Sequence, residues 1–145
     1  MKNHTYLIGP MECCSVEHMT GWRKEADKYL EECGIPVFDP TRRVSFHDQI
    51  GETLQDTHRN LNICKRIFKQ DLQDIANSRV VLADIRRDSG RGTGSSMELM
   101  FAHMKNKIII LWSNPEDQIH PFMEAIGTEK HYELKDALKA AASYY

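Results

Sequence analysis

The sequence is poor in cysteine and has no long apolar run, and these two shortages exclude several classes of protein. No two cysteines have CxxC spacing among the four present, which are Cys13, Cys14, Cys33 and Cys64. A disulfide scaffold is therefore not indicated, and we expect the thiols to be reduced. The longest apolar run, at 108–112, is far shorter than the roughly 20 residues that cross a membrane. We expect no membrane partner.

Neither sign of charge is in large excess. The 19 Lys and Arg residues against 21 Asp and Glu residues give a formal net charge of −2, which is the wrong balance for a protein that binds a nucleic-acid backbone. A small-molecule ligand is favoured over nucleic acid. The chain reaches residues 5–8 without a long apolar segment or a small-residue cleavage site, so we expect a cytoplasmic protein.

No set of histidines and cysteines has the spacing of a metal site. Cys13 and Cys14 are followed by His18, but no second pair of suitably placed ligands exists, and the seven histidines form no HExxH-like set. We predict no metal and no cofactor.

The order of apolar segments predicts an α/β fold. The 145 residues, 41% of them hydrophobic, fit one domain over residues 1–145. Strands are predicted at 5–8, 35–38, 80–83 and 108–111, with a weaker one at 131–132, and helices at 20–33, 58–77, 95–105 and 134–142. Strands that are apolar on both faces are typical of a parallel sheet covered on both sides. We therefore predict a doubly wound sheet of about five strands.

Three local features refine this prediction. Gly34 marks the end of the first helix, and residues 41–57 are polar and read as a long loop near the site. The helix at 58–77 has the clearest apolar stripe, formed by Leu61, Cys64, Phe68, Leu72 and Ile75. Asp71 falls on the flank of that stripe, and Asp74 lies further towards the polar side.

Ligands of such folds bind at the carboxyl ends of the strands. The candidate binding residues there include Gly9, Pro10, Asp39 and Asp84, and the segment from Asp84 to Gly94 contains three arginines and two aspartates. This segment could attract a phosphate through Arg91, but it matches no phosphate-loop fingerprint. A solvated surface loop is the simpler interpretation.

Glu98 is the first candidate for catalysis. A glycine-rich loop leads into a helix that we expect to begin with Ser95 as N-cap, so Glu98 falls in its opening turn. A helix N-terminus favours an ionised carboxylate by roughly 0.3–1 kcal/mol, which suits a nucleophile. The alternative is structural, because Glu98 could close a capping box with Ser95.

Asp71 is the second candidate. A carboxylate beside an apolar stripe lowers the stability of the fold unless it is paired with another group, so an unpaired one is retained only where it serves a function. Asp71 is therefore either a hydrogen-bonded structural residue or an acid-base or ligand-orienting group in a pocket.

Five motifs, in order along the chain, resemble the nucleoside 2-deoxyribosyltransferases, especially their small bacterial and phage-type members. They are Tyr6-Leu7-Ile8-Gly9-Pro10-Met11, Gly21-Trp22-Arg23, Val37-Phe38-Asp39-Pro40, Asp71-Leu72-Gln73-Asp74-Ile75 and Gly92-Thr93-Gly94-Ser95-Ser96-Met97-Glu98-Leu99. The resemblance extends to about Leu111. It implies a flavodoxin-like sheet, a homo-oligomer whose neighbouring chains complete each other's sites, and a deoxyribonucleoside or deoxyribonucleotide and a nucleobase as partners.

The resemblance also implies a covalent mechanism. Glu98 would attack the anomeric carbon of a 2-deoxyribonucleoside and expel the base, and a second base would take the sugar from the enzyme. Asp71 matches the aspartate that contacts the base and assists its protonation, and Gly9 and Pro10 match the turn that borders the base.

The sequence departs from the family pattern before the nucleophile. Several members carry an aspartate six residues before it, where Gly92 stands here. Asp88, or Ser95 and Ser96, would then hold the sugar or a phosphate, in a site that also contains Gly94.

Two alternatives remain open at the level of sequence. The related 2-deoxynucleoside 5-monophosphate N-hydrolases share the fold and the glutamate and pass the sugar to water, and serines beside an arginine suit their phosphate. The other alternative is a non-catalytic nucleotide-binding sensor module, although such a module would not need both Glu98 and Asp71.

Overall fold

The protein is built on a five-stranded sheet in which every pair of neighbouring strands is parallel. The computed structural model describes residues 3–10, 16–42, 61–87 and 92–145. The strand order is β2-β1-β3-β4-β5, the flavodoxin-like order. The strands are β1 (His4–Ile8), β2 (Val37–Phe38), β3 (Ser78–Asp84), β4 (Ile108–Trp112) and β5 (Glu129–His131). The predicted doubly wound parallel sheet is confirmed.

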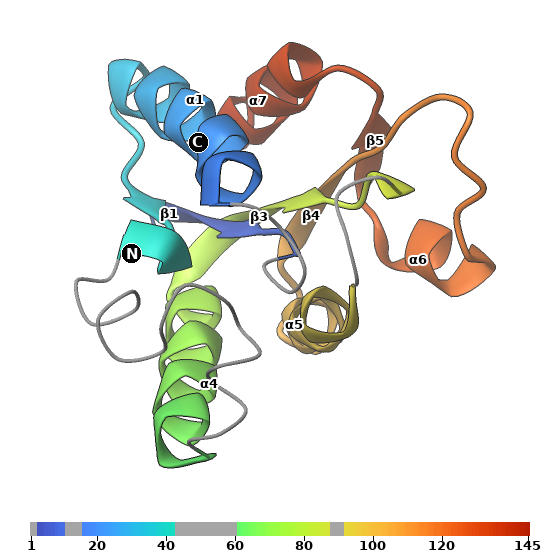
Figure 1. Ribbon diagram of the computed structural model, residues 1–145. Helices are drawn as coiled ribbons and strands as arrows, with labels where there is room; N and C mark the ends of the chain where they lie inside the picture. The colour runs from blue at the N-terminus through green and yellow to red at the C-terminus, as the bar shows by residue number, and fades with distance from the viewer. Residues whose placement is uncertain (1–2, 11–15, 43–60, 88–91) are drawn as a thin grey trace.

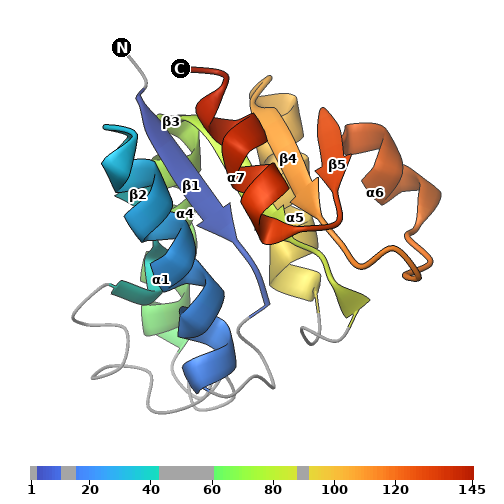
Figure 2. The ribbon, with the colours of Figure 1, turned by 90° about the horizontal axis from the view of Figure 1, so that it is seen from above.

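Helices cover both faces of the sheet. Helices α1 (Val16–Glu32) and α7 (Leu134–Ala142) lie on one face, and α4 (Leu61–Ala76) and α5 (Thr93–Met104) lie on the other (Figure 1). The short helix α6 (Pro121–Ile126) lies beyond the β5 edge, beside the strand (Figure 2). None of the helices among the described residues is long and apolar enough to cross a membrane.

The apolar strands explain this layering. Leu82 and Ile110 pack into the cluster beneath α1 and α7, whereas the neighbouring Val81 and Ile109 pack into the cluster beneath α4 and α5. All four side chains are fully buried. Because successive strand residues point to opposite faces, a run that is apolar throughout needs cover on both sides.

The first predicted helix and the second predicted strand differ from the structure at their ends. Helix α1 begins at Val16 rather than near residue 20, and β2 contains only Val37 and Phe38. The amide of Ile35 donates to Leu30 O at 2.9 Å, so this residue belongs to the helix end and not to the sheet. Gly34 has φ +76° there, as expected of the glycine that ends a helix.

The remaining segments agree with the prediction in part. A 3-10 turn, η1 (Pro40–Arg42), follows β2, and the rest of the predicted loop at 41–57 lies outside the described residues. Helix α7 has the predicted bounds. Helix α6 was not predicted, although His120 before Pro121 is a recognisable helix start.

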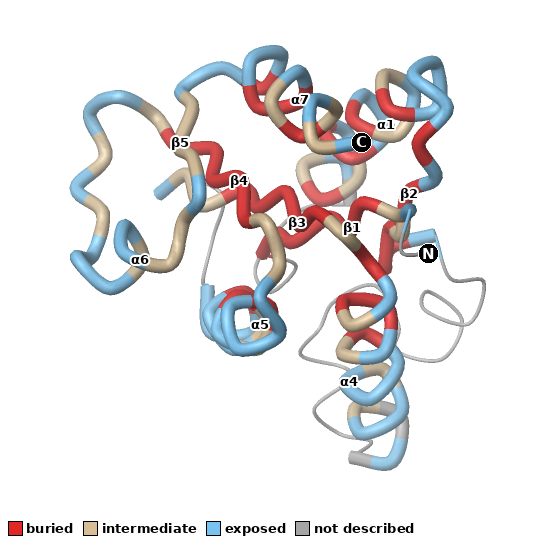
Figure 3. Tube along the Cα trace, turned by 180° about the vertical axis from the view of Figure 1, so that it is seen from behind, coloured by how far each residue is buried: buried red, intermediate tan, exposed pale blue. Residues whose placement is uncertain are grey.

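Only the second half of the α4 stripe is core. Ile75 is fully buried, but Phe68 is 40% exposed, because the first turns of α4 extend beyond the sheet (Figure 3). The placement of Asp74 towards the polar side was wrong. Asp74 is 9% exposed and accepts a hydrogen bond from Gln70 Nε2 at 3.1 Å.

Candidate functional site

A cavity of about 610 Å³ lies at the carboxyl edge of the sheet. Its walls come from the ends of β1 and β3, the start of α5 and the segment that leads into α6. The lining residues are Pro10, Asp84, Ile85, Arg86, Arg87, Gly92, Ser95, Ser96, Gln118, Ile119, His120, Pro121 and Met123. This is the edge at which doubly wound folds bind their ligands.

The predicted site residues divide into three groups. Those that line the cavity are Pro10, Asp84, Gly92, Ser95 and Ser96. Those that the structure describes but that do not line it are Gly9, Asp39, Asp71, Gly94 and Glu98. Asp88 lies outside the described residues, as does Arg91.

Helix α5 begins at Thr93, two residues earlier than predicted. Its N-cap is Gly92, which makes no side-chain cap hydrogen bond, and the amide of Ser96 donates to Gly92 O at 2.8 Å. Ser95 is therefore not the N-cap, and Glu98 lies in the second turn rather than the first. The predicted capping box does not form, and the helix dipole is not what favours an ionised Glu98, because its effect fades beyond the first turn.

Glu98 lies on the same helix as two residues that line the cavity, Ser95 and Ser96. It follows Ser95 by three residues on α5, so the two share one face of the helix. Ser95 is 8% exposed and lines the cavity, and Glu98 is half-buried. Glu98 itself is not among the residues that line the cavity.

Asp84 and Arg86 form one wall of the cavity. Arg86 Nε donates to Asp84 Oδ1 at 2.9 Å and Arg86 Nη2 donates to Asp84 Oδ2 at 3.0 Å. The Arg86 guanidinium also lies 3.7 Å from the centre of the Trp112 ring. A planar guanidinium held on two sides makes this wall well ordered, and the buried charge of Asp84 is matched by a cation.

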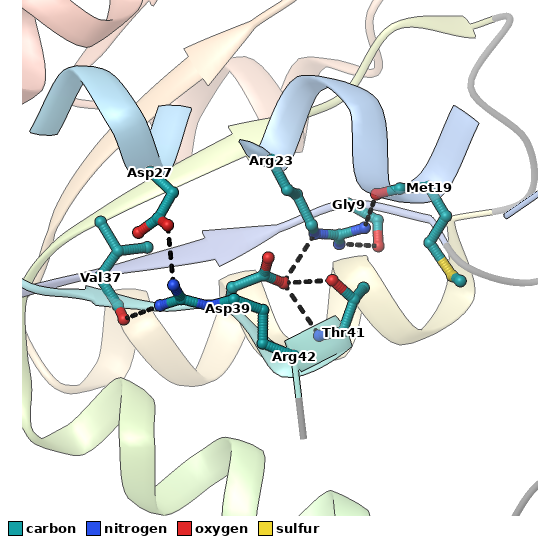
Figure 4. A network of polar contacts seen from close by, with 8 residues as sticks. All are labelled: Gly9, Met19, Arg23, Asp27, Val37, Asp39, Thr41 and Arg42. Carbon is teal, nitrogen blue, oxygen red and sulfur yellow. Dashed lines mark hydrogen bonds and ion pairs between the residues drawn. The ribbon is translucent and has the colours of Figure 1, made fainter. Parts of the chain in front are cut away.

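A second cluster of charges surrounds Gly9, just beyond β1 (Figure 4). Arg23 is fully buried and donates to Gly9 O at 3.0 Å and to Met19 O at 2.8 Å. Burial lowers the pKa of Arg23, and the charges of Asp39, Tyr6, Glu98 and Asp84 act in the opposite direction. Glu98 is therefore within electrostatic range of a buried cation.

Asp39 faces this cluster rather than the cavity. Its Oδ1 accepts hydrogen bonds from the amide and the hydroxyl of Thr41, at 2.9 and 2.6 Å, and lies 3.7 Å from Arg23 Nε. Asp71, by contrast, lies on α4 and is 4% exposed. The prediction that Asp71 flanks the apolar stripe agrees with its burial.

The loop before α6 contributes a histidine to the cavity. His120 Nδ1 accepts a hydrogen bond from the amide of Phe122 at 3.1 Å and caps α6. In the neutral imidazole the proton is then on Nε2. His120 thus has two roles, because its Nδ1 caps α6 while its ring lines the cavity.

Sequence reasoning missed Arg23 as a site residue and missed the whole segment 118–123. The signal for Arg23 was present, because Arg23, Ala26 and Leu30 follow one another at helical spacing, and an arginine on an apolar helix face needs a partner. The segment 118–123 offered only the His-Pro pair that starts α6.

The part of the chain that the structure describes holds no group of three His, Cys, Asp or Glu side chains able to bind a metal ion. Cys13 and Cys14 lie outside the described residues.

Comparison with solved structures identifies the fold. A 2-deoxyribosyltransferase from the psychrotolerant bacterium Bacillus psychrosaccharolyticus matches with a TM-score of 0.70 and 21% identity, over 93% of this chain and 90% of that chain. The chain has the fold of a 2-deoxyribosyltransferase. No family model and no curated protein matches the sequence.

Two further structures share this 2-deoxyribosyltransferase fold. A CMP N-glycosidase from Clostridium botulinum matches with a TM-score of 0.61 and 15% identity, over 98% of this chain and 99% of that chain. A conserved protein from Enterococcus faecalis matches with a TM-score of 0.70 and 10% identity, over the full length of both. The resemblance seen in the sequence motifs is thus confirmed at the level of the fold.

Proposed function

We propose that the protein is a nucleoside 2-deoxyribosyltransferase that cleaves the N-glycosidic bond of 2-deoxyribonucleosides and transfers the sugar to another nucleobase. The observation that carries this proposal is the position of Glu98. It follows Ser95 by three residues on α5, on the helix face from which Ser95 lines the cavity at the carboxyl edge of the sheet. The transferase and the N-glycosidase that share the fold both act on this type of bond.

The proposed reaction has two steps. A carboxylate oxygen of Glu98 attacks the anomeric carbon while the bond to the base nitrogen breaks, and the electron pair leaves with the base. Asp71 assists by protonating the departing base. In the second step a nitrogen of the incoming base attacks the same carbon, the ester electron pair returns to Glu98, and Asp71 takes up the proton that this nitrogen loses. Without a 2-hydroxyl the sugar reaches the cation-like transition state more easily.

The second candidate is hydrolysis of 2-deoxynucleoside 5-monophosphates. The observation that favours it is the chemistry of the cavity. Ser95 and Ser96, at the start of α5, line the same cavity as Arg86 and Arg87. Backbone amides at a helix start and nearby cations are suited to a phosphate. The same Glu98 would act, with water as the acceptor.

One assay separates these reactions. The protein is incubated with deoxyinosine or thymidine, with and without adenine, and with the corresponding monophosphates, and the bases and nucleosides are separated by chromatography. Formation of deoxyadenosine from deoxyinosine and adenine supports transfer. Release of base only from monophosphates replaces the first proposal by the second, and the absence of any base release leaves the binding-module alternative.

Arg87→Ala provides a further test of the phosphate. Arg87 is exposed and lines the cavity, so its loss should raise KM for a monophosphate, most strongly at low salt. A neutral nucleoside should be unaffected.

We also propose that the protein is a homo-oligomer, as expected from the family resemblance. Helix α5 exposes Met97, Met100 and Met104 by 54%, 50% and 70%. Their spacing places them on one helix face, and a contiguous exposed apolar face is typical of an interface. Light scattering should show a smaller assembly for Met100→Glu than for the wild type, and Lys139→Glu on exposed α7 surface is the control.

A further inference from the structure

The guanidinium of Arg86 is held in a fixed plane at the carboxyl edge of the sheet. It lies 3.7 Å from the centre of the Trp112 ring, and Trp112 is in register with Asp84 on the neighbouring strand. Arg86 Nε and Nη2 donate to the two carboxylate oxygens of Asp84 at 2.9 and 3.0 Å. A ring contact on one face and a bidentate bond along one edge together fix the position and the tilt of this plane.

The accessible part of Arg86 belongs to the cavity. Trp112 is 8% exposed and is not part of the cavity lining, whereas Arg86 lines the cavity and keeps 19% of its side chain exposed. Trp112 covers one face of the guanidinium, and Asp84 takes the edge that carries Nε. A ligand in the cavity therefore meets the guanidinium from the side that is turned away from Trp112.

The surroundings of this guanidinium suit a flat, uncharged group. Apolar side chains share the cavity with Arg86, and they are Ile85, Ile119, Pro121 and Met123. The Asp84 carboxylate beside the guanidinium would repel a second anion that approached the same cation. A neutral planar ring meets no such repulsion, and nucleobases stack on guanidinium planes in many complexes.

We propose that Arg86 is the stacking platform for the nucleobase, which lies over the guanidinium face that is turned away from Trp112. The inference rests on the proposed function, because it names the part of the nucleoside that this cavity wall receives. Stacking depends on the ring and not on its hydrogen-bonding edge, so Arg86 selects planar heterocycles as a class. The phosphate of a monophosphate would then be bound by Arg87 and the start of α5, and not by Arg86.

The first test follows the arginine Nε–H signals of the wild type by NMR while adenine, hypoxanthine or thymine is added. A base stacked on Arg86 places its Hε near an aromatic ring, and the ring current should move that signal upfield. The signal is assigned by its loss in Arg86→Lys. Arg79 is the internal control, because its guanidinium also lies over an aromatic ring, that of Tyr145 at 5.2 Å, but at the opposite end of β3. Its signal should stay in place.

A sugar phosphate without a base is the second probe in this titration. The Arg86 signal should stay in place when 2-deoxyribose 5-phosphate is added. A signal that moves with the sugar phosphate and with none of the bases overturns the inference and assigns Arg86 to the phosphate. A signal that none of the three bases moves also overturns it.

The second test measures the affinity for the same bases by calorimetry. Arg86→Lys keeps a cation beside Asp84 but loses the planar group, so we expect Kd for a base to rise at least about fivefold. Kd for 2-deoxyribose 5-phosphate should stay within about twofold of the wild-type value. Arg79→Lys makes the same change in the arginine over Tyr145 and is the matched control, which should alter neither Kd. Equal base affinity in Arg86→Lys and the wild type overturns the inference.

These binding measurements do not depend on turnover. If Arg86→Lys does not fold, as judged by circular dichroism, the titration of the wild type still decides the question. If bases bind over Arg86 while the wild type releases no base from any substrate, the proposed function fails and the assignment of Arg86 stands. If the enzyme is active, Arg86→Lys should raise KM for deoxyinosine with a smaller change in kcat, because the base stays stacked until it leaves.

Discussion

The guanidinium of Arg86 stacks on the indole of Trp112 at 3.7 Å, at the point where β3 and β4 end side by side. Asp84, paired in register with Trp112, holds the same guanidinium with two hydrogen bonds. The cavity wall is thus one unit made from two adjacent strand ends. Its stability depends on all three side chains.

Removing Arg86 should destabilise the protein. In Arg86→Ala the Asp84 carboxylate, which is 1% exposed, is left without its bidentate partner, and we expect a loss of about 3 kcal/mol in the free energy of unfolding. Urea denaturation measures this loss in the free energy of unfolding. Arg87→Ala, next in the chain and exposed, should change the free energy by no more than about 0.5 kcal/mol. Equal stability of the two variants would contradict the role of the pair.

Loss of the proposed nucleophile should abolish turnover without unfolding the protein. Glu98→Gln keeps the size of a half-buried side chain, so circular dichroism and the melting temperature should change little. Base release should fall by several powers of ten, because a missing nucleophile is not replaced by other groups in the site. A variant that retains more than about a tenth of the wild-type rate would rule out the covalent role.

Deoxyribonucleosides should be much better substrates than ribonucleosides. The 2-hydroxyl withdraws electrons from the anomeric carbon and destabilises the cation-like transition state. The comparison is kcat/KM for deoxyinosine and inosine under the same conditions. Equal values would indicate a general nucleoside hydrolase.

Gly9 and Gly94 should respond oppositely to an added methyl group. The Cβ of Gly9→Ala would lie 2.8 Å from Trp22 and 3.2 Å from Arg23, and we expect a loss of about 1–3 kcal/mol from overpacking. Gly94 lies in α5 with nothing within 4 Å of its Cβ position, so Gly94→Ala should gain roughly 0.5–1 kcal/mol. Thermal and urea unfolding of both variants test the contrast.

One contribution to acid stability should depend on Tyr144. The hydroxyl of Tyr144 donates to Glu129, and this hydrogen bond is the main reason why the pKa of Glu129 is lowered. Since the folded pKa is below the unfolded one, the stabilisation is present above the usual pKa of about 4.3 and is lost as the pH falls through the folded value. Tyr144→Phe should therefore lower the melting temperature at neutral pH and reduce its decline below about pH 4.3. Parallel declines in both proteins would contradict this assignment.

Much of the fold was predictable because burial patterns are local. The runs at 80–83 and 108–111 are apolar at every position, and this pattern alone indicates strands with cover on both faces. The start of α5 was not predictable in the same way. Thr93, Ser95 and Ser96 are all acceptable capping residues, and the structure uses Gly92 instead, without any side-chain cap.

The sequence by itself determined the alternation of strands and helices, the parallel sheet and the edge at which the cavity lies, because periodicity and strand ends are encoded in neighbouring residues. Only the tertiary structure decided which distant residues meet there. Arg23 reaches the end of β1 from one sheet face, and α5, which carries Glu98, packs against β1 from the other. His120 enters through a helix that carries little sequence signal. The arrangement of these distant residues depends on strand order and helix packing. These two features fix the distances between segments, and the local sequence pattern of one segment contains no information about another.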